Sequence, residues 1–465
     1  MFPLTRLRIV FGGNIVRILV ASAIALVAAG CSADGDPPPV AEAPPVIGTP
    51  SPSPTPTPTP TPAPTPRETA TGYDLAGRVL LVEGDDLAVG PTSFVARYAS
   101  ANPSLKVHNL ASAGATIATL QSRREEALKL KPDVLTISLA LHDLCLAKDA
   151  REWARAIDDY AAPFREAGTT VLITSPLPRD SADDNECDKK HGYQFKGATE
   201  RAFNTTSFGF DAVAHFGGDA VLNAAGATAD SNLYVDGVVP TAAAQERLAP
   251  IFARTINNVW SVLLGEPALV APKDDGVTVV VAEGSSSAVT YDPYFNGRYR
   301  SKGGFDEWHA AAKGGSGVHG LTKRIDRVKL KNADVVSIYI GVNDLSSFDT
   351  TTEFSEKLKS YASQLRSRGT KVLAFTLPNR LVKGQIDERH NEMRKELSAI
   401  LKKADWIDGY ADFAGHPVMG ADSAPLDTNL FRDGVHATNY GHSLYFEAYE
   451  PAMDRVLSAS HPSRE

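Results

Sequence analysis

The sequence is poor in cysteine and has no excess of basic residues. Only three cysteines occur among 465 residues: Cys31, Cys145 and Cys187. Lys and Arg total 47 against 55 Asp and Glu, which gives a formal net charge of −8. This acidic balance argues against nucleic acid as the partner, because nucleic-acid binding favours a basic face. A hydrophobic fraction of 43% is that of a globular protein, so a sizeable core can form.

The N-terminal apolar run is too short for a comfortable membrane span. It extends from Ile18 to Ala29 and follows a basic start that contains Arg6, Arg8 and Arg17. A basic start, a short apolar run and small residues at its end are typical of an export signal. We therefore expect residues 1–30 to be a signal peptide and not part of the fold.

The end of this run, Ala28-Ala29-Gly30-Cys31, resembles a bacterial lipoprotein signal. The resemblance implies an acylated Cys31 that anchors the chain to a membrane of the bacterial cell envelope, outside the cytoplasm. An ordinary signal peptide with an incidental cysteine is the alternative. If Cys31 carries lipid, Cys145 and Cys187 remain in an oxidising compartment, either as a disulfide or as two thiols.

A spacer follows the anchor over residues 31–72. Proline and threonine dominate it, and the run from Ser51 to Pro66 alternates almost strictly. Such a segment buries too little apolar surface to fold and favours extended polyproline geometry. It is expected to hold the folded part away from the membrane.

The remaining chain is an internal repeat. Five sequence blocks recur in the same order: GRVLLVEGDD and GVTVVVAEGSS, PDVLTISLALHDL and ADVVSIYIGVNDL, REAGTTVLITSPLP and RSRGTKVLAFTLPN, FDAVAHFGG and IDGYADFAG, LYVDGVVPT and LFRDGVHAT. The offset barely drifts, because Asp143 and Asp344 are 201 residues apart and Asp236 and Asp433 are 197 apart. We interpret this as a duplicated domain, with copies at residues 73–266 and 267–465.

Each copy alternates strand-like and helix-like segments. Residues 277–282 and 335–340 are predominantly apolar runs, which suit strands buried on both faces of a parallel sheet. Apolar stripes at helical spacing follow, as at Phe354, Leu358, Tyr361 and Leu365. The pattern predicts two flavodoxin-like, three-layer α/β/α domains in tandem, with ligands bound beyond the carboxyl ends of the strands.

Polar blocks follow the predicted strands of the second copy. They are Gly284-Ser285-Ser286, the lone Gly315, Gly341-Val342-Asn343-Asp344 and Asp433-Gly434-Val435-His436. Their order and spacing resemble those of the SGNH/GDSL hydrolases. The resemblance implies a serine esterase or acyl hydrolase that needs neither a metal nor an organic cofactor. Its substrate would be an ester, such as an O-acetyl group on a small molecule or an envelope carbohydrate.

The resemblance also implies the role of each residue. Ser286 is the expected nucleophile, His436 its base, and Asp433 the carboxylate that orients the imidazole. The oxyanion hole would use the backbone N–H groups of Ser286 and Gly315 and the amide side chain of Asn343, with Gly317 as the alternative glycine. That list of donors depends on the serine register, since Ser285 and Ser287 flank Ser286 and Ser285 replaces the family's aspartate.

The first copy lacks this set. It has Asp86, His142 and Val239 where the second has Ser286, Asn343 and His436, so we expect it to be non-catalytic. A metal bound by Asp86 and His142 is an alternative without an evident third ligand. Because one copy has lost its site, a non-catalytic envelope- or carbohydrate-binding protein is the competing hypothesis for the whole chain.

Overall fold

The computed structural model describes residues 72–139, 142–143, 150–177, 210–214, 216, 232–235, 239–269, 278–289, 295, 298–299, 302, 304–305, 307–345, 348 and 350–460. Near the N-terminus it adds a short antiparallel pair, β1 (Val10–Phe11) and β2 (Asn14–Ile15). Cys31, Cys145 and Cys187 lie outside the described residues, so the lipid anchor and the disulfide remain predictions. Within those residues, no helix combines the length and apolar character that a membrane crossing requires.

The first domain is built on a five-stranded parallel sheet. Its strands are β3 (Val79–Gly84), β4 (Lys106–Asn109), β5 (Val134–Ser138), β6 (Thr170–Thr174) and β7 (Ala212–Ala214), in the order β4-β3-β5-β6-β7. Its helices are η2 (Asp86–Ala88), α1 (Phe94–Ala101), α2 (Ile117–Lys129), α4 (Ala150–Glu166) and α7 (Ala242–Leu264).

Alternate residues of this sheet face two different helix layers. Leu80, Val82 and Leu172 pack in one apolar cluster with side chains of α1 and α7. Leu81 and Val171 pack in another, with side chains of α2 and α4. Because successive strand residues point to opposite faces, the sheet lies between two layers of helices.

The second domain repeats the arrangement. Its strands are β8 (Val279–Gly284), β9 (Glu307–Ala310), β10 (Val335–Tyr339), β11 (Lys371–Phe375) and β14 (Gly409–Ala411), in the order β14-β11-β10-β8-β9 and all parallel. A hairpin of β12 (Leu381–Val382) and β13 (Gln385–Ile386) follows β11. The helices are α9 (Val318–Lys329), α10 (Thr351–Arg366), α11 (Glu388–Lys403), η4 (Ala424–Leu426) and α12 (Asn439–Ser460).

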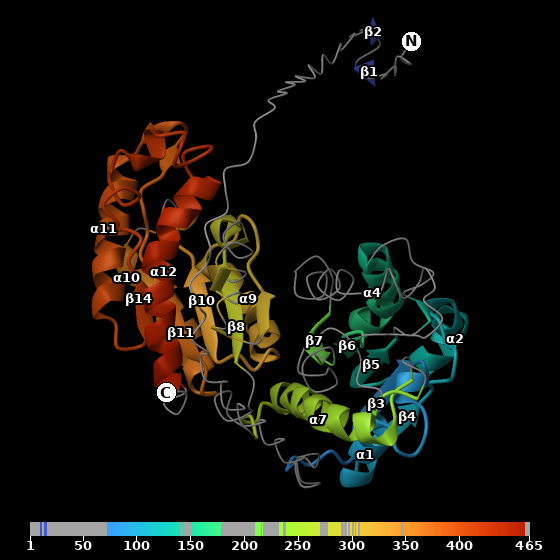
Figure 1. The fold of residues 1–465 in the computed structure, drawn as a ribbon. Helices are drawn as coiled ribbons and strands as arrows, with labels where there is room; N and C mark the ends of the chain where they lie inside the picture. Colours follow the sequence, from blue (N-terminus) through green and yellow to red (C-terminus); the bar gives the residue numbers. More distant parts are fainter. Residues whose placement is uncertain are drawn as a thin grey trace, which may run out of the picture. The chain divides into compact units, whose positions relative to one another are not determined.

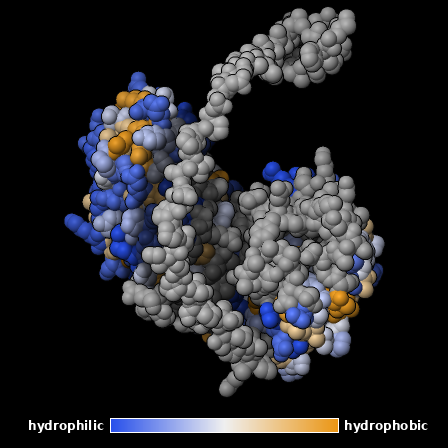
Figure 2. Space-filling model, viewed as in Figure 1, coloured by the Kyte–Doolittle hydropathy of each residue, from blue (hydrophilic) through white to orange (hydrophobic). Residues whose placement is uncertain are grey.

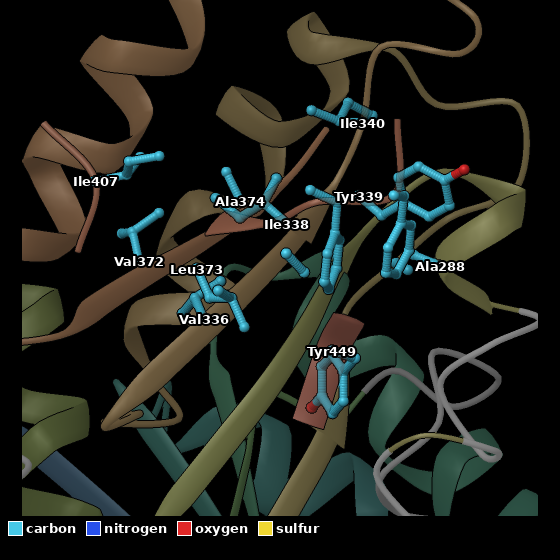
Figure 3. Close-up of a cluster of buried hydrophobic side chains, with 14 of the residues drawn as sticks. Ala288, Val336, Ile338, Tyr339, Ile340, Val372, Leu373, Ala374, Ile407 and Tyr449 are labelled. Carbon is cyan, nitrogen blue, oxygen red and sulfur yellow. The ribbon is translucent and has the colours of Figure 1, made fainter. Parts of the chain in front are cut away.

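Helices cover this second sheet as they cover the first (Figure 1). Helix α10 packs between α9 and α11, while α12 packs along β11 and β14. Figure 3 shows part of the core between these elements, including Val336 of β10, Leu373 of β11 and Tyr449 of α12, all fully buried. Burying a large apolar side chain contributes roughly 1.5–3 kcal/mol to the free energy of folding. Burial of the apolar strand residues therefore stabilises the sheet. The outward surface of these helices is mainly hydrophilic (Figure 2).

Both sheets have the flavodoxin-like strand order, which confirms the predicted fold class. Numbered within each domain, the order is 2-1-3-4-5, and it reverses between the first and third strands. In the second domain this switch point lies between β8 and β10. Open α/β sheets bind ligands outside the carboxyl ends of the strands at such a point, so the topology directs attention to the residues after Gly284 and Tyr339.

The first strand of the second domain is longer than its apolar run suggested. We expected it to end at Ala282, but β8 continues through Glu283 to Gly284. Glu283 is fully buried, and its carboxylate pairs with Arg324 of α9. A charged residue can occupy a central strand when its charge is paired in this way.

Candidate active site

Ser286 lies in the turn that follows β8. Gly284 has a φ of +142°, and a Cβ at that position would lie 2.1 Å from the carbonyl oxygen of Tyr339 on β10. Only glycine permits this backbone conformation and this approach of the two strands. The amide of Ser285 donates to the same carbonyl at 3.2 Å, and a helical turn over residues 286–289 begins directly at Ser286.

The three consecutive serines differ in their surroundings. Ser285 and Ser287 are buried, whereas Ser286 is partly exposed. The Oγ of Ser286 lies 2.9 Å from Nε2 of His436, although 150 residues separate them in the sequence. Ser286 therefore combines solvent access with an imidazole partner.

Asp433 holds the other side of the His436 ring. Its Oδ2 lies 2.7 Å from Nδ1 of His436, and its Oδ1 accepts the amides of Val435 at 3.0 Å and His436 at 2.7 Å. Burial alone would raise the pKa of the Asp433 carboxyl, but these hydrogen bonds outweigh it and lower the pKa below its ordinary value. A charged carboxylate places the ring proton on Nδ1, which leaves Nε2 free to accept from the Ser286 hydroxyl.

The loop that carries Asp433 and His436 is closed by backbone hydrogen bonds. The amide of Arg432 donates to the carbonyl of His436 at 2.9 Å, and the amide of Leu381 in β12 donates to the carbonyl of Gly434 at 2.9 Å. Gly434 has a φ of +74° and lies against the Leu381 side chain. The loop is therefore fixed before α12 begins at Asn439.

Gly315 and Gly317 occupy different places in the loop after β9. A Cβ at Gly317 would lie 2.2 Å from Oδ1 of Asp344, so this glycine makes room for that carboxylate. Gly315 has a φ of +71°, and its neighbour Gly314 lies beside Ser286, where a Cβ would be 3.9 Å from the serine Cβ. Gly317 thus lies against Asp344, whereas Gly315 belongs to the segment beside Ser286.

Asn343 and Asp344 follow β10 and attach this loop to it. Nδ2 of Asn343 donates to the carbonyl of Ser316 at 3.1 Å. Oδ1 of Asp344 accepts the amide of Val318 at 2.7 Å, at the N-terminus of α9. Burial raises the pKa of Asp344 to about 6, against the opposing effect of that hydrogen bond.

A buried ion pair beneath the site was not anticipated from the sequence. Arg324 donates to Glu283, and the Glu283 carboxylate also accepts the amide of Gly284 at 2.7 Å. Burial raises the pKa of Glu283 to about 7, while the arginine opposes the shift. The signal that could have revealed the pair is the repeat itself, because Glu83 and Arg123 occupy the matching positions of the first copy and also pair.

The matching edge of the first domain holds a different set. Oδ2 of Asp86 accepts the amide of Gly114 at 2.8 Å and lies 2.8 Å from Nε2 of His142. Val239 stands where the second copy has its histidine, and Asp236 lies outside the described residues. No group of three or more His, Cys, Asp or Glu side chains suited to a metal occurs in the part of the chain that the structure describes.

Known proteins resemble part of this chain. Residues 276–444 match the model of the GDSL-like Lipase/Acylhydrolase family. A putative acylhydrolase from Bacteroides fragilis is 19% identical, with a TM-score of 0.33, over 39% of this chain and 88% of that chain. A GDSL-like lipase from Bacteroides thetaiotaomicron is 16% identical, with a TM-score of 0.33, over 43% and 98%. An acetylxylan esterase from Geobacillus stearothermophilus is 18% identical, with a TM-score of 0.30, over 39% and 95%.

The sequence has no match among the curated proteins. The family match spans all four polar blocks, from the turn at Gly284 to the loop that ends in His436. Residues 276–444 are thus similar to the GDSL-like lipases and acylhydrolases.

Proposed function

We propose that the second domain is a serine esterase in which Ser286 is the nucleophile, His436 the general base and Asp433 the residue that orients the base. The observation that carries this proposal is the continuous set of contacts from Ser286 Oγ to His436 Nε2, 2.9 Å, and from His436 Nδ1 to Asp433 Oδ2, 2.7 Å. A serine hydroxyl is a weak nucleophile unless a neighbouring base accepts its proton, and this arrangement supplies that base.

In the first half of the reaction, Ser286 Oγ attacks the carbonyl carbon of the ester while its proton passes to His436 Nε2. The resulting imidazolium is stabilised by the Asp433 carboxylate. Collapse of the tetrahedral intermediate breaks the bond to the alcohol, which leaves with the proton from His436. The acyl group remains on Ser286.

The negative oxygen of the intermediate needs preorganised donors. We assign these to the backbone N–H groups of Ser286 and Gly315 and to the side chain of Asn343. The side-chain nitrogen of Asn343 has two N–H donors, and the hydrogen bond to the Ser316 carbonyl uses one of them. The second remains for the substrate oxygen.

In the second half, His436 accepts a proton from a water molecule as that water attacks the acyl group on Ser286. The proton then returns to Ser286 Oγ as the carboxylic acid leaves. Asp433 keeps its charge throughout, which the lowered pKa of its carboxyl favours.

We propose an ester of a small acyl group, such as acetyl, on a small molecule or an envelope carbohydrate as the substrate. The side chains of His436 and Asp433 are 22% and 49% exposed. An open site of this kind supports an ester whose alcohol part is large, because the bulk of the alcohol can remain outside the domain.

We further propose that the chain acts at the surface of an envelope membrane, anchored through Cys31. Mass spectrometry of the N-terminal peptide tests this directly and should find an acylated Cys31. A Cys31→Ser variant should leave the membrane fraction. An unmodified cysteine in the mature protein would contradict the anchor and leave the esterase proposal untouched.

Hydrolysis of p-nitrophenyl acetate by the full chain tests the esterase. Ser286→Ala should lower kcat by about three orders of magnitude or more, as removal of the nucleophile does in other triad enzymes. Ser287→Ala and Asp86→Ala are the matched controls and should stay within threefold of the parent protein.

Equal rates for the parent protein and Ser286→Ala would remove this serine from the mechanism. If the folded parent protein hydrolyses none of the esters tested, that result would favour the competing hypothesis of a non-catalytic envelope-binding protein. The first domain has the same strand order with Asp86 and Val239 in place of the serine and the histidine, so this scaffold folds without them.

A further inference from the structure

Arg324 of α9 makes more contacts than its ion pair with Glu283. It also donates to Ser316 Oγ at 2.7 Å and to the carbonyl of Gly284 at 3.3 Å. Its side chain is only 13% exposed. One guanidinium thus connects the end of β8, directly before the proposed nucleophile, to the loop that carries Gly315.

The first domain has the same arginine without the loop contact. Arg123 donates to Glu83, whose other oxygen accepts the Tyr160 hydroxyl at 3.0 Å, as Glu283 accepts Tyr361 at 3.5 Å. The position that matches Ser316 is Ala115, which offers no hydroxyl. The buried pair is therefore common to both domains, and the contact to the loop is a feature of the domain that has Ser286 and His436.

Ser316 connects the arginine to two proposed oxyanion donors. Its carbonyl accepts Nδ2 of Asn343 at 3.1 Å, and its backbone nitrogen follows Gly315 directly. The amide of Ser316 donates to the carbonyl of Lys313 at 3.1 Å, and Lys313 in turn donates to the carbonyl of Gly284 at 3.1 Å. A shift of the Ser316 side chain would therefore be transmitted to both donors.

Gly320 provides the space that the Ser316 hydroxyl occupies. A Cβ at this position would lie 2.1 Å from Ser316 Oγ and 3.1 Å from Arg324 Nη1. Glycine is less favourable than alanine in a helix, so its presence in the first turn of α9 calls for a packing reason. The matching residue of the first domain is Thr119, where no serine needs the space.

We propose that Arg324 and Ser316 are positioning residues that hold the Gly315 amide and the Asn343 side chain in place as oxyanion donors. The inference rests on the proposed esterase function. Such donors act only when they are aimed at the oxygen that becomes charged in the transition state, and displacement by about 1 Å can cost about a hundredfold in rate. The effect belongs to kcat, since the donors bind the transition state more strongly than the ester.

Ser316→Ala is the central variant, because it removes the hydroxyl and leaves the buried Glu283–Arg324 pair intact. It also installs the residue that the first domain has. We expect kcat for p-nitrophenyl acetate to fall about ten- to a hundredfold, with KM within threefold and an unchanged thermal unfolding midpoint. A merely structural role for Ser316 would move the midpoint and leave kcat alone.

Gly320→Ala tests the same contact from the other side, because its methyl group displaces the Ser316 hydroxyl. Alone, it should lower kcat by a similar factor. In the Ser316→Ala background there is no hydroxyl to displace, so the double variant should match Ser316→Ala within threefold. Effects that multiply would contradict the shared mechanism.

Arg324→Lys and Arg123→Lys form a matched pair in the two domains. Both keep a positive charge near the buried glutamate and lose the planar geometry that reaches several acceptors. Arg324→Lys should lower kcat at least tenfold, and Arg123→Lys should leave kcat within twofold. Equal kcat values for the two variants would overturn the proposal.

Ser286→Ala in the same assay separates the two levels of inference. If Ser286→Ala is inactive while Ser316→Ala and Gly320→Ala both keep kcat within twofold, the positioning role is wrong and the esterase stands. If Ser286→Ala is as active as the parent protein, the esterase proposal and the positioning role fail together.

Discussion

At the carboxyl end of its first strand, the second domain presents Ser286 and the first presents Asp86. In the second, the Ser286 hydroxyl lies 2.9 Å from Nε2 of His436. In the first, the Asp86 carboxylate accepts the Gly114 amide and contacts His142. Gly114 and His142 match Gly315 and Asn343, the donors proposed to bind the substrate oxygen. In the first domain, the anion that contacts this matching pair is the Asp86 carboxylate.

The pKa of Asp86 agrees with this description. Burial alone would raise it, but the Gly114 amide and the His142 ring lower it below the ordinary value. The first domain thus stabilises a negative charge at positions that match those where, as proposed, the second stabilises the charge of the transition state. The same backbone geometry thus carries a fixed carboxylate in one domain and a proposed catalytic serine in the other, with different side chains at three matching positions.

Other features are shared and belong to the fold. Asp143 accepts the amide of Ile117 at 2.5 Å, as Asp344 accepts that of Val318 at 2.7 Å, so both cap the helix that follows the second strand. The turn after the first strand also differs: the first domain has no serine at position 86, and the second has no aspartate at position 285. The first domain keeps Asp85, which accepts the amide of Leu87 at 3.2 Å, and the second has Ser285 instead.

The largest difference between the domains should appear when their histidines are removed. His436→Ala should lower kcat for p-nitrophenyl acetate by about three orders of magnitude or more, since the proton acceptor is lost. His142→Ala should leave kcat within twofold, because its ring contacts the Asp86 carboxylate where the second domain has a serine. A comparable loss from both variants would show that the first domain takes part in the chemistry.

Asp433→Asn should have the next largest effect. The amide cannot hold the ring proton on Nδ1 as the carboxylate does, and kcat should fall by about two to four orders of magnitude. Asp86→Asn is the control in the first domain and should not change kcat. Rates for Asp433→Asn within threefold of the parent would contradict the orienting role.

The shared capping aspartates should respond to pH in the same way. Burial raises the pKa of both Asp143 and Asp344 to about 6. A raised folded-state pKa means that their contribution to stability is present below the unfolded value near 4 and is lost as the pH rises through about 6.

Asp143→Asn and Asp344→Asn should remove this dependence. The free energy of unfolding of the parent domain, relative to its variant, should fall by about 2–3 kcal/mol between pH 4 and pH 7 in both cases. Denaturant unfolding of each variant across that range measures it. A rise with pH, or a response in one domain alone, would break the equivalence of the two caps.

The smallest effects should come from the turn after the first strand of each domain, at Ser285 and Asp85. The buried Ser285 hydroxyl has no hydrogen-bond partner among the described residues, so Ser285→Ala should keep kcat within threefold and change stability by less than about 1 kcal/mol. Asp85→Ala should cost about 0.5–2 kcal/mol through the lost cap at Leu87. Equal losses from both variants would mean that Ser285 carries a bond equivalent to that of Asp85.

The sequence allowed the fold to be predicted because its signals are local. A predominantly apolar run such as residues 335–340 and the helical stripe from Phe354 to Leu365 each predict one element through the repeat of its backbone. The repeat then doubled the evidence for each element. Glu283 was the exception, since only the paired arginine explains a buried charge at the end of β8.

The site could be predicted in part. Ser286, Asn343 and His436 occur in recognisable blocks, and the topology brings their segments to one edge. The serine register could not be decided from the sequence, because exposure and the reach to His436 depend on the turn. The contacts of Arg324, Ser316 and Gly320 were also beyond the sequence, since a serine and a glycine carry no signal until their distances are known.

The most direct measurement is the reaction of the full chain with a fluorophosphonate probe, followed by mass spectrometry of its peptides. We predict one adduct, on the peptide that contains Ser286, and we expect Ser286→Ala and His436→Ala each to abolish it. The first domain should carry none. An adduct elsewhere, or no adduct on the folded parent protein, would contradict the claim that Ser286 is an activated nucleophile.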